Sequence, residues 1–406
     1  MPNALISTDA GILFILAANA SLWFFLEKRT GWKMFNFVPP LIFVYVLPAV
    51  FSNTGLISNT SGVYDWMGSN VLPMFLVLLL LNVDIKATIK VMGKGVWVML
   101  IGTLGVVIGA PLGYMVVSNW LSPDSWMGYA ILSGSWIGGT GNMAAVQNAI
   151  DPTGEATGSL FGLAVIADNV VYLVWLPLLL NMKRLAPIFN KFTGVTDEHL
   201  SNMKKAADEM IVEKGKPAMR DYLYLIMLGM GVTWLSVMLS ELLPTFDNST
   251  GFVAEVLGPA LQPSTYKILL VTTFGILLSF SPARKIPGSH AIAMALVYLF
   301  VSRMGAKTDL AGLSGEAIPF VVGAYVWIFI HGAFILGAAK VFKIDVHTAA
   351  IASAANIGGA ASAPIVASFH DERLVPVSIL MALIGYAVGN YASLLLVVPL
   401  LKLVAG

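Results

Sequence analysis

Asp168 is the side chain with the clearest capacity for chemistry, because it interrupts a long apolar stretch at about 157–181. A carboxylate in such surroundings must bind a cation, carry a proton or find a polar partner. Asn169 follows directly, so one of the two polar side chains can face a site while the other packs or assists. We therefore predict a cation site centred on Asp168 and Asn169, with sodium as the ion expected at Asp168.

Two glycine-rich runs form the second chemical feature of the chain. They are LSGSWIGGTGNMAAVQNAI (132–150) and ASAANIGGAASAPIVASF (352–369). Ile-Gly-Gly at 137–139 aligns with Ile-Gly-Gly at 357–359, and the similarity continues upstream and downstream. This pattern indicates an internal repeat of at least three apolar segments in each half.

Glycine inside an apolar segment weakens a helix by up to about 1 kcal/mol per residue. A single run is explained by close helix packing, as the spacing of Gly105, Gly109 and Gly113 suggests. Broken backbone at membrane depth needs protein or a water-filled cavity around it. Two runs at matched positions therefore predict discontinuous helices near 134–149 and 353–369 that meet near the midplane. Their N-termini would face an anion and their carbonyl ends a cation.

The polar and glycine residues around the two runs complete the candidate site. Thr140 and Asn142 join the cation site, with the alternative that they cap the broken half-helices. Because the apolar segments hold almost no Lys or Arg, we expect helix N-termini, and no guanidinium, to bind any substrate carboxylate. The predicted substrate-binding residues are Gly138, Gly139, Gly141, Asn356, Gly358, Gly359, Ser362 and Asn390.

The elements that must position these residues are membrane helices. The 406 residues are 57% hydrophobic and 11% charged, whereas a soluble domain carries roughly a quarter charged residues. The fold class predicted is an all-α polytopic membrane protein with about 12–13 transmembrane helices. The apolar segments lie near 10–26, 37–52, 69–83, 95–118, 126–149, 157–181, 221–243, 266–281, 289–302, 318–340, 347–369 and 374–402; a shorter one lies near 250–264.

A polar region rich in both charges divides the chain. We predict a first membrane half at 1–182, a polar linker at 183–220 that holds one amphipathic helix, and a second membrane half at 221–406. The residues before the first apolar segment include no Lys or Arg, so that segment is expected to be a retained span and not a cleaved signal.

Several classes of function are excluded by what the sequence does not contain. A net charge of +1 does not indicate the excess of positive charge that nucleic-acid-binding proteins carry. The lack of cysteine excludes disulfides and thiolate metal sites. No Walker phosphate loop, H-E-x-x-H zinc motif or G-x-S-x-G elbow occurs. The chain is therefore not expected to be an enzyme or to need a cofactor, apart from sodium as a coupling ion.

The paired runs, Gly138-Gly139-Thr140-Gly141-Asn142 and Asn356-Ile357-Gly358-Gly359, resemble those of the cation:proton antiporter / anion transporter superfamily. The whole chain resembles its YjcL-like family of bacterial membrane proteins, labelled as a domain of unknown function. The resemblance implies an inverted repeat with two crossing discontinuous helices, a core domain beside a panel or dimerisation domain, elevator-like movement and a homodimer. Antiporters of the superfamily tend to carry two carboxylates, or Asn then Asp, where this chain has Asp168 then Asn169.

These observations lead to one functional hypothesis with two alternatives. The hypothesis is a secondary transporter in the bacterial inner membrane that couples symport of a small organic anion to sodium or protons. The first alternative is a sodium:proton antiporter in which Asp168 alternates between the two ions. The second is a membrane scaffold or channel that does not transport actively, in which Asp168 is dispensable. The expected partners are the lipid bilayer and the anion.

Overall fold

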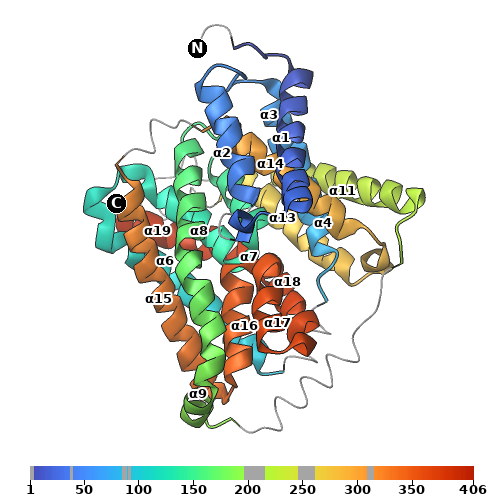
Figure 1. Cartoon of the computed structure of the whole chain (residues 1–406). Helices are drawn as coiled ribbons and strands as arrows, with labels where there is room; N and C mark the ends of the chain where they lie inside the picture. The colour runs from blue at the N-terminus through green and yellow to red at the C-terminus, as the bar shows by residue number, and fades with distance from the viewer. Residues whose placement is uncertain are drawn as a thin grey trace.

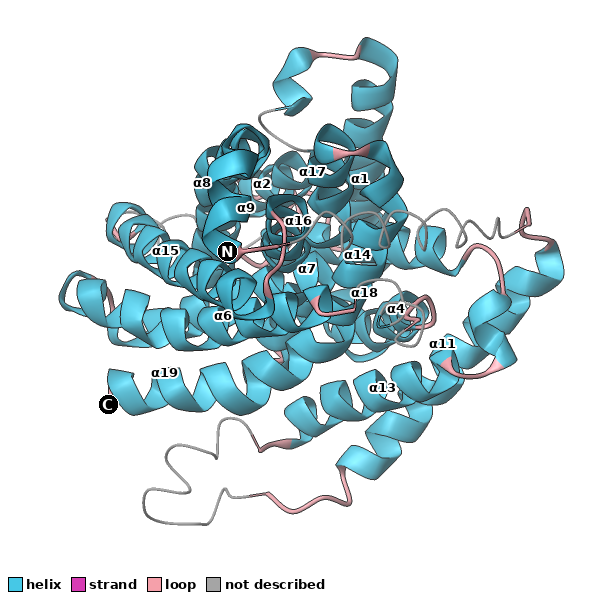
Figure 2. Ribbon diagram, turned by 90° about the horizontal axis from the view of Figure 1, so that it is seen from below, coloured by secondary structure: helices cyan, strands magenta, loops and turns pink. Residues whose placement is uncertain are grey.

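The chain is described by a computed structural model that covers residues 4–36, 40–84, 89, 93–195, 215–245, 261–308 and 315–406. Within these ranges the protein is helical, and its one β-type contact is a bridge between Ile6 and Ile57 (Figures 1 and 2). In chain order the helices are α1 (Asp9–Thr30), α2 (Pro40–Asn53), α3 (Gly62–Trp66), α4 (Leu72–Leu80), α6 (Gly95–Val117), α7 (Trp126–Ile150), α8 (Gly158–Asn181), α9 (Ala186–Thr193), α11 (Met219–Ser240), α13 (Pro263–Ser279), α14 (Ser289–Ala306), α15 (Ala317–Phe342), α16 (Val346–Ile357), α17 (Gly359–His370), α18 (Val375–Ala392) and α19 (Val398–Ala405).

Each of the twelve predicted apolar segments coincides with one helix or with a run of helices. A π-helical turn at Met67–Val71 joins α3 to α4, and a second at Ser393–Val397 joins α18 to α19. Eight of the described helical segments are long and apolar enough to cross a bilayer. The protein is therefore a multi-pass membrane protein. Most of the short segment near 250–264 and half of the polar linker, from 196 to 214, lie outside the described residues.

Packing divides the described helices into two groups, which Figure 1 shows in its upper right and lower left parts. One group, the scaffold group, consists of α1, α2, α4, α11, α13 and α14. The other, the core group, consists of α6, α7, α8 and α15–α19. Each group draws helices from both halves of the sequence, so the halves interlock.

Glycines bring α6 and α15 into close contact at the base of the core group. A Cβ on Gly109 would lie 2.3 Å from Trp327, and one on Gly113 would lie 2.6 Å from the carbonyl oxygen of Gly323. Gly105, Gly109 and Gly113 therefore serve helix packing, as their spacing predicted. The indole of Trp327 is thereby fixed, and its Nε1 donates to the Val106 carbonyl at 2.8 Å.

Candidate functional site

The two glycine runs form breaks in their helices at equivalent positions. Gly139 interrupts α7 with φ 74° and ψ −175°, and Gly359 begins α17 with φ 56°, directly after Gly358 ends α16. Positive φ of this kind is accessible to glycine at little cost and strains other residues. The two left-handed glycines are 220 residues apart, which is the offset of the sequence repeat.

The two breaks lie against each other in the core group. A Cβ built on Gly359 would lie 3.6 Å from the Cα of Gly139, so the two backbones meet with no side chain between them. The ring of Tyr386, on α18, lies beside both: its Cε1 is 3.3 Å from a Cβ position on Gly139 and 3.9 Å from one on Gly359. Four half-helices, from α7, α16 and α17, therefore converge at one point.

Asp168 faces the turn of α7 that precedes the break. Its Oδ2 accepts a hydrogen bond from Ser135 Oγ at 2.8 Å, and its Oδ1 accepts one from Trp136 Nε1 at 2.9 Å. Asn169 instead donates to the carbonyl of Val165 in its own helix at 2.8 Å. Both side chains are half-buried. The carboxylate is thus the member of the pair directed at the breaks.

Packing and hydrogen bonding hold the donors of Asp168 in place. The Trp136 ring lies 4.4 Å from the ring of Trp327, and both residues are fully buried. No ion pair to Asp168 occurs among the residues that the structure describes. Its charge is therefore stabilised by neutral donors, and a cation that replaced them would meet a single negative charge.

Tyr172 lies one helical turn after Asp168 and extends the polar face of α8 to the second break. Its hydroxyl is buried and interacts with the Ser362 hydroxyl. That oxygen lies 3.0 Å from a Cβ position on Gly358, and the Ser362 hydroxyl lies beside the same position. The sequence prediction missed Tyr172, although its spacing of four residues from Asp168 was a usable signal.

The second half of α7 holds Asn142 under the first break. Its Nδ2 donates to the carbonyl of Tyr386 at 3.2 Å and fills space that a Cβ on Gly138 or on Gly389 would occupy, at 2.0 and 2.2 Å. Thr140 is half-buried next to the break. Gly141 faces Leu79 and Phe75 of α4, in the scaffold group. Asn142 therefore joins α7 to α18 at the site.

Two predicted residues lie in neighbouring helix interfaces instead. Asn356 donates to the Met99 carbonyl at 3.0 Å and accepts from Thr103 Oγ1 at 3.1 Å, both on α6. Asn390 donates to Thr272 Oγ1, on α13, at 2.9 Å. The structure thus brings Asp168, Thr140, Asn142, Ser362 and the glycines at 138–139 and 358–359 together, and engages Asn356 and Asn390 with adjacent helices.

One buried guanidinium stands out, since the sequence indicated almost no buried Arg or Lys. Arg303, near the end of α14, is 0% exposed, and its Nε donates to the Tyr64 carbonyl at 2.6 Å. The residue directly follows the apolar segment predicted at 289–302, where solvation at the membrane interface would have accounted for it. Its burial depends on the packing of α14 against α3, and the sequence pattern does not record that contact.

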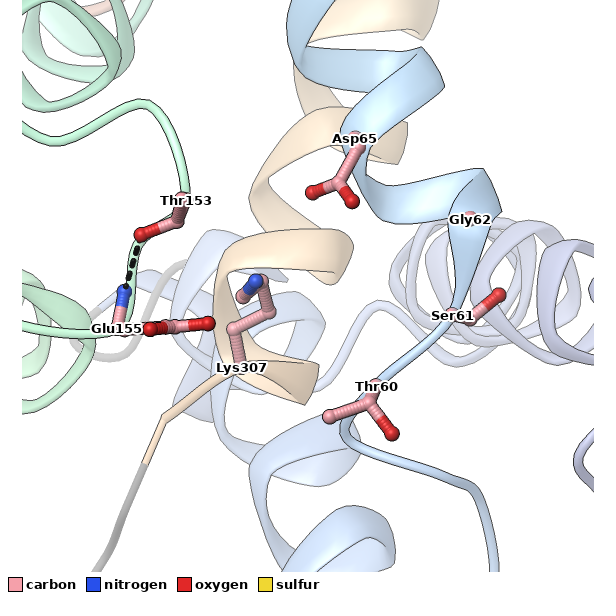
Figure 3. Close-up of a pocket in the computed structure, with 7 residues that line it drawn as sticks. All are labelled: Thr60, Ser61, Gly62, Asp65, Thr153, Glu155 and Lys307. Atoms are coloured by element: carbon pink, nitrogen blue, oxygen red, sulfur yellow. Dashed lines mark hydrogen bonds between the residues drawn. The ribbon is translucent and has the colours of Figure 1, made fainter.

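A cleft of about 440 Å³ opens at Lys307, four residues after Arg303, and carries charges of both signs. Figure 3 shows Asp65, Glu155 and Lys307 around it. Burial and the nearby Arg303 guanidinium lower the pKa of Lys307, against the opposing effect of acids that include Asp65 and Glu155. The cleft is lined by Thr60, Ser61, Gly62, Asp65, Thr153, Glu155 and Lys307.

Comparison with known proteins places nearly the whole length of the chain in one family. Residues 13–403 match the family described as "Protein of unknown function (DUF819)". The chain is also similar to the "Uncharacterized membrane protein YjcL" of Bacillus subtilis (strain 168), with 24% identity over 404 residues, covering 97% of each protein. The predicted resemblance to the YjcL-like family is confirmed, and the placement in a wider superfamily stays a prediction.

Proposed function

The chain belongs to the DUF819 family, whose matched range includes both helix breaks, and we propose that it is a secondary active transporter. Its cargo is a small organic anion, carried in symport with sodium or protons. The observation that carries this proposal is the meeting of two discontinuous helices at Gly139 and Gly359, beside Asp168.

The chemistry of the breaks supports an anion as cargo. The second half of α7 and the whole of α17 each begin at the meeting point, and a helix N-terminus offers unpaired N–H groups and a partial positive charge. The buried hydroxyls of Tyr172 and Ser362, which lie together at the second break, add polar groups for such an anion. Asp168 supplies the negative charge that a coupling cation would neutralise, which leaves the helix N-termini to stabilise the substrate anion.

The division into two helix groups supports an elevator-like mechanism. Both breaks and the Asp168 face of α8 belong to the core group, while Gly141 contacts Phe75 and Leu79 of the scaffold group. Movement of the core group against the scaffold group would expose the site to each side of the membrane in turn. A homodimer formed through scaffold helices, in the bacterial inner membrane, is the assembly we propose from the superfamily resemblance.

The test is cation-dependent thermal stability of the purified protein in detergent. Wild type, Asp168→Asn and the control Asp124→Asn, at an exposed turn, are compared in sodium and potassium at equal ionic strength across pH. A ligand that binds only the folded state stabilises by RT ln(1 + [L]/Kd), about 1.4 kcal/mol at ten times Kd. Sodium should stabilise wild type and the control and leave Asp168→Asn unchanged.

The other outcomes separate the alternatives. A sodium effect that protons displace, with no effect of any organic anion, favours the sodium:proton antiporter. Absence of a sodium effect, with a pH dependence that Asp168→Asn abolishes, favours proton coupling. If Asp168→Asn matches wild type in every condition, Asp168 is dispensable and the scaffold or channel alternative replaces the proposal.

A further inference from the structure

The short helix α9 presents an apolar stripe on the surface of the protein. Its exposed apolar side chains, with the residue that directly precedes the helix, are Leu185 (52% exposed), Ile188 (70%) and Phe192 (49%). Residues three or four apart share one face of a helix, so these side chains lie in a row. Phe189, by contrast, is only 8% exposed. One face of α9 therefore packs on the protein while another, apolar as well, faces outward.

Contacts with the ends of α15 and α16 fix the orientation of α9 (Figure 1). The side-chain oxygen of Asn190 accepts a hydrogen bond from the backbone N–H of Val346, at the start of α16, at 3.1 Å. The ammonium of Lys340, in the last turn of α15, donates to the carbonyl of Phe192 and lies 4.9 Å from its ring centre. The apolar stripe is therefore held in one direction and does not depend on the stability of an isolated short helix.

The lengths of the neighbouring helices place α9 at the surface of the bilayer. The 24 residues of α8 extend over about 36 Å, which exceeds the roughly 30 Å of the hydrocarbon core. The chain then passes through a short 3₁₀ turn, Met182–Leu185, before α9 begins. A helix at this height with an exposed apolar face meets the boundary between lipid head groups and acyl chains.

Two exposed cations flank the apolar stripe. Arg184 precedes Ile188 by four residues and Lys191 follows it by three, so each lies about one turn from the centre of the stripe. Neither forms a hydrogen bond or an ion pair within the part of the chain that the structure describes. Lys183 is different, because its ammonium donates to the Phe369 carbonyl at 2.8 Å. Arg184 and Lys191 are therefore the two charges available to a ligand at the surface.

The whole of this end of the protein carries an excess of positive charge. Lys340 and Lys343 lie at the end of α15, next to α9. The two aspartates nearby are engaged: Asp345 caps α16, and Asp371 pairs with the neighbouring arginine at 3.0 Å. At the opposite end of α15 the helix is preceded by an acid, Glu316. Excess Lys and Arg mark the cytoplasmic side of a membrane protein, and the cytoplasmic leaflet presents anionic lipids.

We propose that α9 is an interfacial helix that binds anionic phospholipids of the cytoplasmic leaflet. Its apolar stripe lies among the upper parts of the acyl chains, and Arg184 and Lys191 bind lipid phosphates. A guanidinium forms paired hydrogen bonds with a phosphate, and an ammonium acts as a point charge. Phosphatidylglycerol is preferred over phosphatidylcholine, because the choline group of the latter carries a positive charge that both side chains repel. Lipid binding here requires neither Asp168 nor transport.

The experiment measures which lipid contacts α9 in vesicles that contain the full-length protein. The chain has no cysteine, so Ile188→Cys provides a single thiol for a fluorescent label on the apolar stripe. All vesicles contain phosphatidylglycerol and phosphatidylcholine in equal amounts, and only one of the two lipids carries bromine, a quencher, on its acyl chains. Brominated phosphatidylglycerol should quench the label more strongly than brominated phosphatidylcholine. Inorganic phosphate, added at constant ionic strength, should not change that preference.

Removal of the two charges identifies the groups that select the lipid. Arg184→Gln with Lys191→Gln, both exposed, should lower the preference for phosphatidylglycerol by about fivefold for each charge removed. The matched control is Lys28→Gln with Arg29→Gln in the last turn of α1, which removes the same charge elsewhere and should leave the preference unchanged. The proposal is overturned if neither brominated lipid quenches the label, if both quench it equally, if phosphate abolishes the preference, or if the control pair lowers it as much as the α9 pair.

Discussion

At the scale of single residues, the carboxylate of Asp168 is held by hydrogen bonds and by no ion pair that the structure describes. Ser135 and Trp136, its donors, immediately precede the break in α7, so any change at the break moves them. A cation that approaches Asp168 must displace them or share their acceptor oxygens. Ion binding and the geometry of the break are therefore mechanically linked through two consecutive residues.

Gly139 should be the glycine that tolerates a side chain least for conformational reasons. Its φ of 74° with ψ of −175° belongs to a region that only glycine adopts readily, and forcing another residue into it costs about 1–3 kcal/mol. We expect Gly139→Ala to lower thermal stability by that amount. Gly337→Ala, in α15 with no atom near its Cβ position, is the control and should be neutral or slightly stabilising. Equal effects would contradict the assigned break.

Sequence reasoning at this scale identified Asp168 and both glycine runs, because a buried charge and a weak helix former are visible without a structure. It left open which of Asp168 and Asn169 faces the site, since that depends on how α8 is rotated against α7. It missed Arg303 for a related reason: the residue lies at the edge of an apolar segment, and tertiary packing that includes a contact with Tyr64 of α3 removes it from water.

At the scale of elements, the loop between α7 and α8 is organised by one carboxylate. Asp151 accepts hydrogen bonds from the backbone of Gly154, Ala156 and Thr157 and from the hydroxyls of Thr153 and Thr157. The loop therefore determines where α8 begins relative to α7, and so the position of Asp168 along the axis of α8.

Asp151 should make stability depend on pH in the acid range. Burial by itself would raise the pKa of Asp151, but the hydrogen bonds from Thr153, Thr157 and Gly154 outweigh burial and lower it below the ordinary value of 3.8. A carboxyl with a lowered pKa in the folded state stabilises fully above about pH 4, and this contribution is lost as the pH falls through the folded-state value.

Replacing Asp151 tests this assignment. Asp151→Asn should lose about 1–3 kcal/mol of stability at neutral pH and should show a smaller further loss on acidification than wild type. Thermal unfolding from pH 3 to pH 7 measures both effects, with exposed Asp124→Asn as the reference. If acidification destabilises Asp151→Asn as much as it destabilises wild type, other carboxyl groups cause the loss of stability in acid.

The helices themselves were predictable because hydrophobicity over about twenty residues leaves few alternatives in a bilayer. The segment predicted at 69–83 begins earlier in the structure, at Gly62. Its first turns mix apolar side chains with polar or small residues such as Asp65 and Gly68, so they do not register as a continuous apolar stretch. The π-helical turn there inserts an extra residue that no periodicity predicts.

At the scale of the whole molecule, two helix groups pack along a boundary that includes the charged cleft. Thr60 precedes α3, which packs with α1 of the scaffold group, whereas Thr153 belongs to the loop between α7 and α8 of the core group; both line the cleft. The chain has no cysteine, so introduced thiols can be cross-linked selectively. The proposed elevator movement requires this boundary to slide.

A cross-link across the boundary should therefore stop transport. The pair Thr60→Cys with Thr153→Cys, joined by a short bismaleimide, is expected to abolish flux in proteoliposomes and to leave the folded protein intact. The control pair is Thr60→Cys with Lys307→Cys, which lines the same cleft. Lys307 follows the scaffold helix α14, so this cross-link stays on the scaffold side of the boundary, and flux should persist after it forms. Full transport through the first linked pair would contradict a sliding boundary.

The two-group arrangement was not derivable from hydrophobicity, because it depends on which helices pack and not on where they lie in the chain. The repeat was the one sequence feature that predicted a tertiary contact, because the offset of 220 residues relates Gly139 to Gly359. The superfamily resemblance supplied the expectation of core and panel domains.

The measurement that tests the central claim most directly is ion-driven accumulation of organic anions in proteoliposomes. Vesicles containing wild type, Asp168→Asn or Asp124→Asn receive a mixed set of small organic anions under a sodium or proton gradient, and mass spectrometry measures the anions in the lumen. Wild type and Asp124→Asn should accumulate at least one anion above the external concentration only when the gradient is present, and Asp168→Asn should accumulate none. Accumulation by Asp168→Asn equal to wild type, or none by wild type under either gradient, would contradict a transporter coupled at Asp168.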